Sequence, residues 1–451
     1  MAMRPQRNLR VAAAAATVAL SISAAACATA GTADRPPAST NQPAPASTAP
    51  DADPDSVVAA HAGEEWYLGT VPAAPVAADA SLEPVRIGMI NQEQTPLGSY
   101  PEMRAAVEAA VAWVNAELGG VAGRPIELVT CVTRFSPDES RECAESLVAQ
   151  GVVAFAGGVD VMGSASIAAI EAAGLVLVGG IPVSIEEQRS RSAFFFSGGD
   201  AGALAAFAAH AAERGAAAIT IAYGEEIPAF EIAARDYGAI VARHLGLEVD
   251  LAPFSILETD FEALVRNAAA RGSDGVMVLA ATQSCVPVMS AMRDHAPSLA
   301  LYLTGACAAA DTLTAAGTAA DGVVFNAEGP VDGDVSDADI YLDVVTRYAT
   351  EPAGGAGTVA FRGFMNLYSL ILDAADRGQV SAAGITELAR SAADRSSFWG
   401  HPFTCDGAQV PGLVALCAPQ QILFTIGQTP SGFTSITDWI ATDELFAAAL
   451  R

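Results

Sequence analysis

From Val85 onward, short apolar runs alternate with longer amphipathic stretches, and this alternation restricts the possible folds more than any other feature of the chain. "VRIGMI" (85–90) and "VVAFAGG" (152–158) have the length and composition of buried strands. "PEMRAAVEAAVAWVNAELGG" (101–120) predicts a helix that begins at Pro101 and ends near Gly119. Strand–helix alternation is typical of parallel sheets covered by helices on both faces. Because the alternation runs twice, we expect an α/β protein with two doubly wound parallel-sheet lobes.

The N-terminus indicates export. Arg4, Arg7 and Arg10 precede a short run of small and apolar residues that ends at Cys27. This pattern is typical of an export signal and is too short for a good membrane span. A run of small residues ending in Cys resembles a bacterial lipoprotein cleavage site, and plain cleavage after "CATA" is the alternative. We therefore predict residues 1–27 to be an export signal with lipidation at Cys27, so that the body is extracytoplasmic and anchored to the outer face of the cell membrane.

Residues 28–82 differ in composition from the rest of the chain. They are rich in Pro, Ala, Ser, Thr and Asp and contain little apolar surface to bury. Such a composition predicts a disordered tether between a lipid anchor and a folded body. Trp66 and Tyr67 are the exception, and we expect them to dock onto that body.

Six cysteines lie beyond Cys27, and an even number in an exported protein indicates a disulfide framework. Six cysteines allow fifteen pairings, of which the most local set is the simplest. A metal site is the rival interpretation, but the chain has no CxxC, and its five histidines form no HxxH or HExxH spacing. The predicted disulfides are Cys131–Cys143, Cys285–Cys307 and Cys405–Cys417, and no metal or cofactor is predicted.

Charge and motifs exclude several functions. The net charge is −28, and all 23 basic residues are arginine. Such acidity argues against a nucleic-acid partner, which requires a basic face. The sequence contains no G-x-S-x-G elbow, zinc motif, P-loop or G-x-G-x-x-G after a strand, so we do not expect an enzyme.

Ligands of parallel sheets bind beyond the carboxyl ends of the strands. Five loops lie at such ends: 91–100, 159–163, 179–184, 223–229 and 281–284. Each candidate also has a structural alternative, because an Asp can cap a helix, apolar residues can pack in a lobe core and polar residues can belong to surface loops. The predicted ligand-binding residues are Gln94, Asp160, Val161, Met162, Gly180, Ile181, Tyr223, Ile227, Thr282 and Gln283.

The order of these segments resembles a known family. "VRIGMI", the helix ending "VNAELGG", "GRPIELV" and "SPDESRECAESLV" leading to "FAGG" occur in the order found in extracytoplasmic solute-binding proteins of the leucine/branched-chain amino acid type. "FWGHPFTCDG" (398–407) is similar to a C-terminal segment of that family. The resemblance covers residues 85 to about 430. It implies the type I periplasmic binding fold, capture of a small molecule in a hinged cleft, and delivery to the permease and ATPase subunits of an ABC importer.

The resemblance does not extend to the family's amino acid ligand. In that family a Ser after the third strand and a Ser/Thr pair after the fourth bind the amino acid, whereas Asp160 and "GGIPV" (179–183) stand at the corresponding positions here. A carboxylate beside Asp160 would be repelled by about 1–4 kcal/mol at short range. We therefore expect a neutral or apolar-bodied ligand rather than a simple amino acid.

The expected lobes are discontinuous. We predict lobe one to comprise 84–198 and 329–394, and lobe two 199–328 and 395–445. The chain would then cross between the lobes near Ser197–Asp200, Ala327–Pro330 and Asp394–Ser397, and three crossings would form a hinge. The alternative to a transport receptor is a sensor of the same fold that signals through a partner protein.

Overall fold

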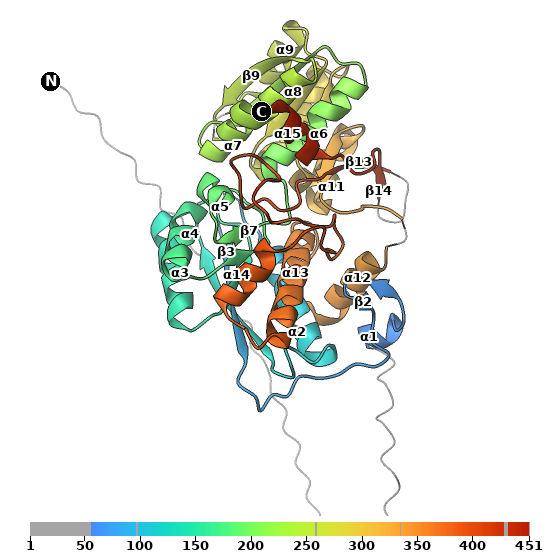
Figure 1. Cartoon of the computed structure of the whole chain (residues 1–451). Coiled ribbons are helices and arrows are strands. Elements are labelled where there is room, and N and C mark those ends of the chain that lie inside the picture. The colour runs from blue at the N-terminus through green and yellow to red at the C-terminus, as the bar shows by residue number, and fades with distance from the viewer. Residues whose placement is uncertain (1–55, 96–97, 258, 334, 428–431, 451) are drawn as a thin grey trace, which may run out of the picture. The chain divides into compact units, whose positions relative to one another are not determined.

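The computed structural model describes residues 56–95, 98–257, 259–333, 335–427 and 432–450. The predicted export signal, the lipidation site Cys27 and residues 28–55 lie outside these ranges. The described chain contains two large sheets with helices on their faces (Figure 1). No helix in the described part is long and apolar enough to cross a membrane.

The first sheet is parallel throughout, with the strand order β4-β3-β5-β6-β7. Strand β3, which lies between β4 and β5, is mostly apolar and is buried along most of its length, as the sequence predicts. The strands are β3 (Val85–Gln92), β4 (Ile126–Thr133), β5 (Ala154–Gly157), β6 (Leu177–Val178) and β7 (Ala193–Phe194).

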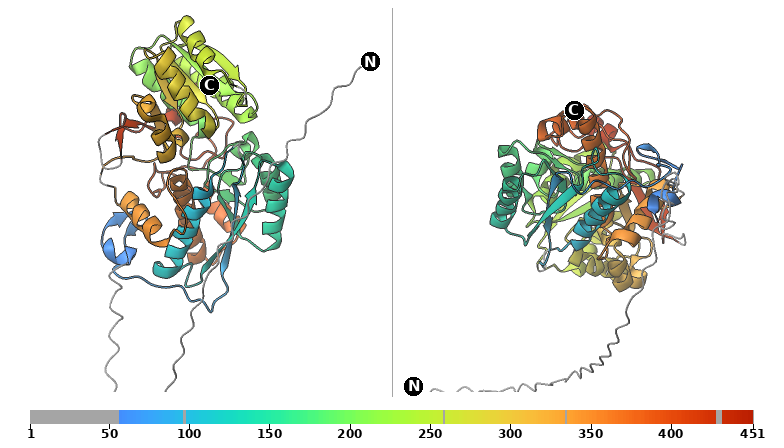
Figure 2. Two further views of the ribbon diagram at one scale, coloured as in Figure 1. Left: turned by 180° about the vertical axis from the view of Figure 1, so that it is seen from behind. Right: turned by 90° about the horizontal axis from the view of Figure 1, so that it is seen from below.

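Helices from two distant parts of the chain cover this sheet. Helices α2 and α13 pack side by side (Figures 1 and 2). Pro101 occupies the start of α2, and its apolar stripe, which includes Met103, Val107 and Val114, is buried, so this predicted helix is confirmed. The helices are α2 (Pro101–Glu117), α3 (Pro137–Ala149), α4 (Gly163–Ala172), α5 (Ile185–Arg189), α12 (Ser336–Tyr348), α13 (Gly357–Asp376) and α14 (Ala382–Arg390).

The second sheet has seven strands in the order β14-β13-β12-β11-β10-β8-β9. Five strands are parallel, and β13 and β14 add an antiparallel edge. Two doubly wound parallel sheets confirm the predicted fold class. The strands are β8 (Ala218–Gly224), β9 (Glu248–Phe254), β10 (Gly275–Leu279), β11 (Ala300–Leu303), β12 (Val324–Ala327), β13 (Ile422–Ile426) and β14 (Phe433–Ser435).

The helices of the second lobe include a π-helical turn, η1, between α7 and α8. Helix α6 packs against this turn. The helices are α6 (Gly199–Glu213), α7 (Pro228–Ile232), η1 (Ala233–Gly238), α8 (Ala239–His244), α9 (Phe261–Ala270), α10 (Cys285–His295), α11 (Ala310–Ala316) and α15 (Thr442–Ala449), with 3-10 turns η2 (Thr282–Ser284), η3 (Gly305–Ala308) and η4 (Gly317–Ala320).

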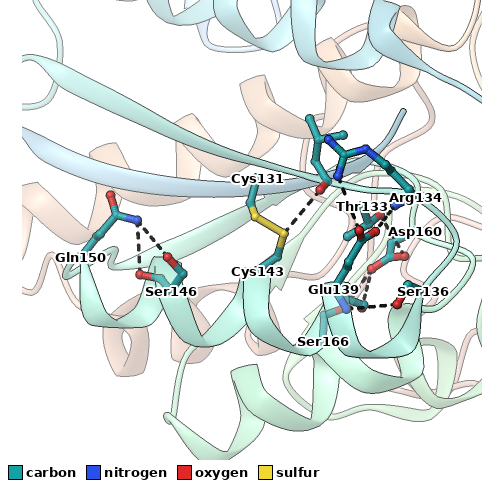
Figure 3. The surroundings of a disulfide bond; sticks show 12 residues. Cys131, Thr133, Arg134, Ser136, Glu139, Cys143, Ser146, Gln150, Asp160 and Ser166 are labelled. Atoms are coloured by element: carbon teal, nitrogen blue, oxygen red, sulfur yellow. Dashed lines mark hydrogen bonds and ion pairs between the residues drawn. A yellow bond between two sulfur atoms is a disulfide. The ribbon is translucent and has the colours of Figure 1, made fainter. Parts of the chain in front are cut away.

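All three predicted disulfides are present. Cys131–Cys143 joins β4 to α3 (Figure 3), so it links a strand to its following helix rather than closing a surface loop. Cys285–Cys307 joins the start of α10 to η3, beyond the neighbouring parallel strands β10 and β11, as expected. Cys405–Cys417 closes a loop between α14 and β13, with a Cα–Cα distance of 4.6 Å.

The structure differs from the predicted tether over residues 56–82, which we call the N-terminal clasp. The clasp contains α1 (Val57–Ala60) and a hairpin of β1 (Glu65–Trp66) and β2 (Gly69–Thr70). Val57, Val58 and Val71 are buried in the core of the first lobe. The composition of this segment suggests disorder, but a few buried side chains and partners distant in sequence hold it in place.

One buried carboxylate holds the start of the clasp. Glu117, at the end of α2, accepts hydrogen bonds from the Ser56 hydroxyl at 2.7 Å and from the Val57 and Val58 amides at 3.2 and 2.8 Å. The Tyr348 hydroxyl donates to the same carboxylate from α12. These bonds hold the pKa of Glu117 below its ordinary value, although burial alone would raise it.

Trp66 and Tyr67 dock as predicted. The Trp66 ring meets Trp113 edge to face with centroids 5.8 Å apart. The Tyr67 ring meets Phe398 at 5.3 Å, and its hydroxyl donates to the Met365 carbonyl at 2.9 Å. The clasp is therefore an integral part of the first lobe.

The third crossing lies further along the chain than expected. Phe398, Phe403, Cys405 and Cys417 are buried in the core of the first lobe, although the sequence places residues 395–445 in lobe two. The Cys417 amide donates to the Phe195 carbonyl at 2.8 Å, which extends the edge of the first sheet beyond β7. The chain then enters the second sheet at β13, so it crosses at residues 418–421 rather than at Asp394–Ser397. Aromatic side chains in "FWGHPF" explain the difference, because they fill the first core.

Candidate functional site

The carboxyl ends of the parallel strands hold most of the predicted ligand-binding residues. In the first lobe, Gln94 follows β3, Asp160 follows β5 and Ile181 follows β6. In the second lobe, Tyr223 lies near the end of β8, and Thr282 follows β10. This is the sheet edge at which doubly wound proteins bind ligands.

One hydrogen bond connects the two strand-end regions. The Tyr100 hydroxyl, in the loop that precedes α2, lies 3.4 Å from the Thr282 hydroxyl in η2 of the second lobe. Burial raises the pKa of Tyr100, so the phenol is neutral and able to donate. Thr282, one of the predicted ligand-binding residues, thus faces the first lobe and shares a hydrogen bond with Tyr100.

Asp160 has all its hydrogen-bond partners within the first lobe. It is 5% exposed, and its carboxylate accepts from the Ser140 hydroxyl at 2.6 Å and the Met162 amide at 3.1 Å. It also accepts from the Thr133 hydroxyl at 3.3 Å (Figure 3). Burial raises the pKa of this carboxyl, and these bonds partly offset the effect. Asp160 therefore organises the turn before α4, which matches its structural alternative.

A second carboxyl lies beside this network. Glu187 forms a capping box with Ser184 at the start of α5, accepting from the Ser184 amide at 3.0 Å and hydroxyl at 2.8 Å. Burial raises the pKa of Glu187 to about 8, and the nearby Asp160 charge adds to the increase. The end of β5 is thus bordered by two buried carboxyls for which the structure gives no cationic partner among the described residues.

Gly180 has a steric role. Its φ is +82°, and a Cβ there would lie 2.5 Å from the Gly158 carbonyl oxygen. The adjacent Gly179 approaches Gly363 of α13 equally closely, since its Cβ would lie 2.6 Å from the Gly363 Cα. Glycine at these positions lets the ends of β5 and β6 pack directly against α13. Binding of a ligand by Gly180 stays a prediction.

The predicted residues of β8 and its loop are in the second core. Tyr223 is 1% exposed, and its hydroxyl accepts from the Arg235 Nε at 3.0 Å. Ile227 is buried in the same core. Both positions match the core-packing alternative, and their contact with a ligand stays a prediction.

The other predicted residues are more accessible. Gln94 is exposed, has φ +57° and accepts from Arg134 at 3.4 Å. The Val161 amide donates to the Gln92 side chain at 3.3 Å, and Ile181 packs against the first core. Met162 is half-buried and Gln283 is exposed. Some of the predicted ligand-binding residues therefore contact other parts of their own lobe, and the others lie at the surface.

Sequence reasoning missed three acidic or phenolic groups near Thr282 and the crossings. Burial raises the pKa of Asp200, at the start of α6, to about 7, and Glu328 adds to the increase. Burial also raises the pKa of Glu102, with Asp311 of the second lobe contributing. Tyr100 belongs to the loop 91–100, which follows a strand end, so the sequence could have placed it near the site. The sequence contains no signal for the burial of Asp200 and Glu102.

The described residues contain no group of three or more His, Cys, Asp or Glu side chains that could hold a metal ion. All six cysteines of the described chain are in disulfides.

Comparison with known proteins agrees with this fold. A family model described as "Periplasmic binding protein" matches residues 84–412, and the chain belongs to that family. The matched segment begins just after the N-terminal clasp. A comparison with curated protein sequences found no match.

Solved structures share the fold at low sequence identity. An ABC transporter solute-binding protein from Rhodopseudomonas palustris, solved with p-hydroxybenzoic acid, has a TM-score of 0.68 and 17% identity, covering 82% of this chain and 100% of the other. A fatty acid ABC transporter substrate-binding protein from Thermomonospora curvata has a TM-score of 0.65, 17% identity and coverages of 83% and 97%. A leucine-binding protein from Thermotoga maritima has a TM-score of 0.65, 18% identity and coverages of 80% and 99%.

Proposed function

We propose that this protein is an extracytoplasmic substrate-binding protein that captures a small molecule between its two lobes and delivers it to the permease and ATPase subunits of an ABC importer. Membership of the periplasmic binding protein family carries this proposal. The Tyr100–Thr282 hydrogen bond supports it, because a ligand seated beside that bond would contact both lobes. A ligand can favour the closed state only through contacts that differ between the two states.

The proposed ligand is neutral or has an apolar body. Asp160 and Glu187 place carboxyl groups at the end of β5. The neighbouring arginines are already paired, since Arg104 bonds Glu93 at 2.9 Å and Arg134 bonds Glu139 at 3.5 Å. Glu187, with a pKa of about 8, is mostly protonated at neutral pH, so the repulsion of a carboxylate ligand would come from Asp160. Both of these neighbouring arginines are already paired, so among the described residues neither guanidinium is free to offset that repulsion. The similar structures bind an aromatic acid, a fatty acid or leucine by their own descriptions, so the fold alone does not select a ligand.

The lipid anchor at Cys27 is part of the proposal. It is supported by the arginine-rich start and the run of small residues that ends at Cys27. Cys27→Ala should release the protein into the medium or leave an uncleaved precursor. Unchanged partitioning of the variant into membranes would exclude lipidation at this residue.

The test of function is mass spectrometry of small molecules released when the purified protein is denatured. We expect one enriched compound without a free carboxylate, and addition of that compound should raise the thermal midpoint of the protein. An enriched amino acid would refute the proposed ligand class. No released compound, together with catalytic turnover on a substrate panel, would refute the binding function itself.

A sensor of the same fold is the second candidate, because periplasmic binding folds can serve either role. A permease that copurifies with the full chain, and uptake that depends on it, would favour transport. Ligand binding without either would favour a sensor that acts through a partner protein.

A further inference from the structure

One buried arginine contacts two of the three crossings. Arg362 lies on α13 of the first lobe and is 5% exposed. Its guanidinium donates to the Glu328 carboxylate at 2.6 Å and to the Phe196 carbonyl at 3.3 Å. It also donates to the Glu328 carbonyl. Phe196 precedes α6 in the first crossing, and Glu328 follows β12 in the second.

Glu328 extends this contact to a further residue of the first crossing. Its second carboxylate oxygen accepts a hydrogen bond from the Ser197 hydroxyl, and that hydroxyl also accepts from the Gly199 amide at 2.9 Å. One ion pair therefore holds residues 196–197 and 328 against the same helix. A guanidinium suits this task because its planar set of donors can reach a carboxylate and two carbonyls at once.

The third crossing is held in a different way. The Cys417 amide bonds the Phe195 carbonyl on the first-lobe side. On the second-lobe side, the side-chain amide of Asn326 donates to the side-chain oxygen of Gln421 at 2.7 Å. Residues 418–420 lie between these two fixed points.

The crossings are in direct backbone contact at glycines. A Cβ on Gly198 would lie 2.7 Å from the Pro419 carbonyl oxygen, and one on Gly202 would lie 3.0 Å from it. Gly199 has φ +54°, which favours glycine. The first and third crossings therefore approach so closely that a side chain at Gly198 would not fit, directly beyond the residues that the arginine holds.

We propose that Arg362 is the positioning residue of the hinge: it fixes Phe196, Ser197 and Glu328 to the first lobe, so that lobe rotation is confined to Gly198–Gly199, Ala327 and 418–420. This inference rests on the proposed function, because it assigns a hinge to a protein that closes on a ligand. It places the third pivot about twenty residues beyond the Asp394–Ser397 position that the sequence indicates. Hinges of this kind are a few residues that absorb the change in backbone angles.

The test measures lobe motion in the ligand-free full chain. Spin labels are introduced through non-natural amino acids at the exposed Glu142 on α3 and Asn267 on α9, which leaves the native disulfides intact. Pulsed electron paramagnetic resonance then gives the distribution of distances between the lobes. Arg362→Lys and Arg362→Met should broaden this distribution or shift it, because an ammonium or thioether group does not reproduce the forked contact.

A matched control separates positioning from general stability. Arg395 forms an ion pair at 2.6 Å with Asp373, which lies on α13 like Arg362. Both partners of this ion pair are in the first lobe. Arg395→Lys should lower the thermal midpoint without changing the distance distribution. A folded Arg362→Met variant with the wild-type distribution and only a lower thermal midpoint would overturn the proposal.

A second variant covers the case in which Arg362→Met does not fold. Glu328→Gln retains the side-chain shape and one acceptor oxygen, and it should give a smaller change of the same kind. A wild-type distribution for Glu328→Gln would also overturn the proposal. Because no ligand is added, failure of this experiment is distinct from failure of the transport function, which the released-compound and uptake measurements decide.

Discussion

The two lobes have the same layered design but are built from the chain in different ways. The second lobe takes five parallel strands and most of its helices from one stretch, residues 199–327, and adds only β13, β14 and α15 from the C-terminus. The first lobe combines the clasp (56–82), the first sheet (85–194), α12 to α14 (336–390) and the disulfide-closed segment 395–418. Its core is thus held by contacts between distant segments. Perturbations that act through these contacts should affect the first lobe selectively.

The largest effect is expected when one buried aromatic ring is removed from either lobe, in two separate variants. Phe361→Ala on α13 should cost about 3–5 kcal/mol of unfolding free energy through the cavity it leaves, since Phe361 is fully buried in the first core. Hydrogen exchange should then accelerate in β3 and β5 and change little in β8 and β10. Phe207→Ala on α6, equally buried, is the matched control and should reverse the pattern. Uniform acceleration in both variants would show that the lobes unfold as one unit.

Removing a disulfide from each lobe sharpens the comparison. Replacing Cys285 and Cys307 by Ala opens a link between residues 22 apart and should cost about 3 kcal/mol by loop entropy. Replacing Cys131 and Cys143, 12 residues apart, should cost slightly less. Chemical denaturation of both variants measures the two costs. A much larger loss for the Cys131–Cys143 variant would mean that this disulfide orders the first lobe beyond its loop length.

The clasp provides a test of the long-range contacts. Glu117→Gln replaces one acceptor oxygen by a donor facing the Ser56, Val57 and Val58 donors, so it should cost about 1–3 kcal/mol. Exchange of the Val57 and Val58 amides should accelerate while the second lobe is unaffected. Because the folded pKa of Glu117 is lowered, its stabilising effect is present above the unfolded value of about 4.5 and is lost as pH falls through the folded pKa. A wild-type acid-unfolding profile for the variant would contradict this role.

The last prediction concerns pH and Glu187, and its effect is a slope of stability with pH rather than a single loss. Its folded pKa of about 8 lies above the ordinary value, so its contribution to stability is fully present below about pH 4.5 and decreases as pH rises toward 8. The slope from this one group is at most about 1.4 kcal/mol per pH unit. Glu187→Gln should flatten the decline of the thermal midpoint over this range. Equal slopes in the variant and the wild type would show that Glu187 is ionised throughout.

The sequence was informative where the periodicity is local. Short apolar runs predicted β3 and β5, and the spacing of Pro101 and the apolar stripe predicted α2. Local cysteine pairs predicted all three disulfides. In each case the residues that determine the feature lie within about twenty positions of one another.

The sequence failed where partners are distant. Nothing in residues 56–58 indicates that Glu117, some sixty positions away, accepts three of their hydrogen bonds. Asp160 could be assigned to the correct loop, but its bonds to Thr133 and Ser140 decide that it faces the lobe interior. Arg362 carries no motif, because its acceptors at 196 and 328 come together only in the folded chain.

The antiparallel edge of the second sheet has a consequence for the newly made chain. Strand β12 ends at Ala327, but its neighbour β13 begins only at Ile422, with Phe325 opposite Phe424. At about 5–20 residues per second, the stretch between them takes on the order of 5–20 seconds to synthesise. During that interval the free edge of β12 offers unpaired backbone groups to any other strand, which is a common start of aggregation. A chaperone that keeps this edge covered until the C-terminal hairpin arrives would therefore raise the yield of folded protein.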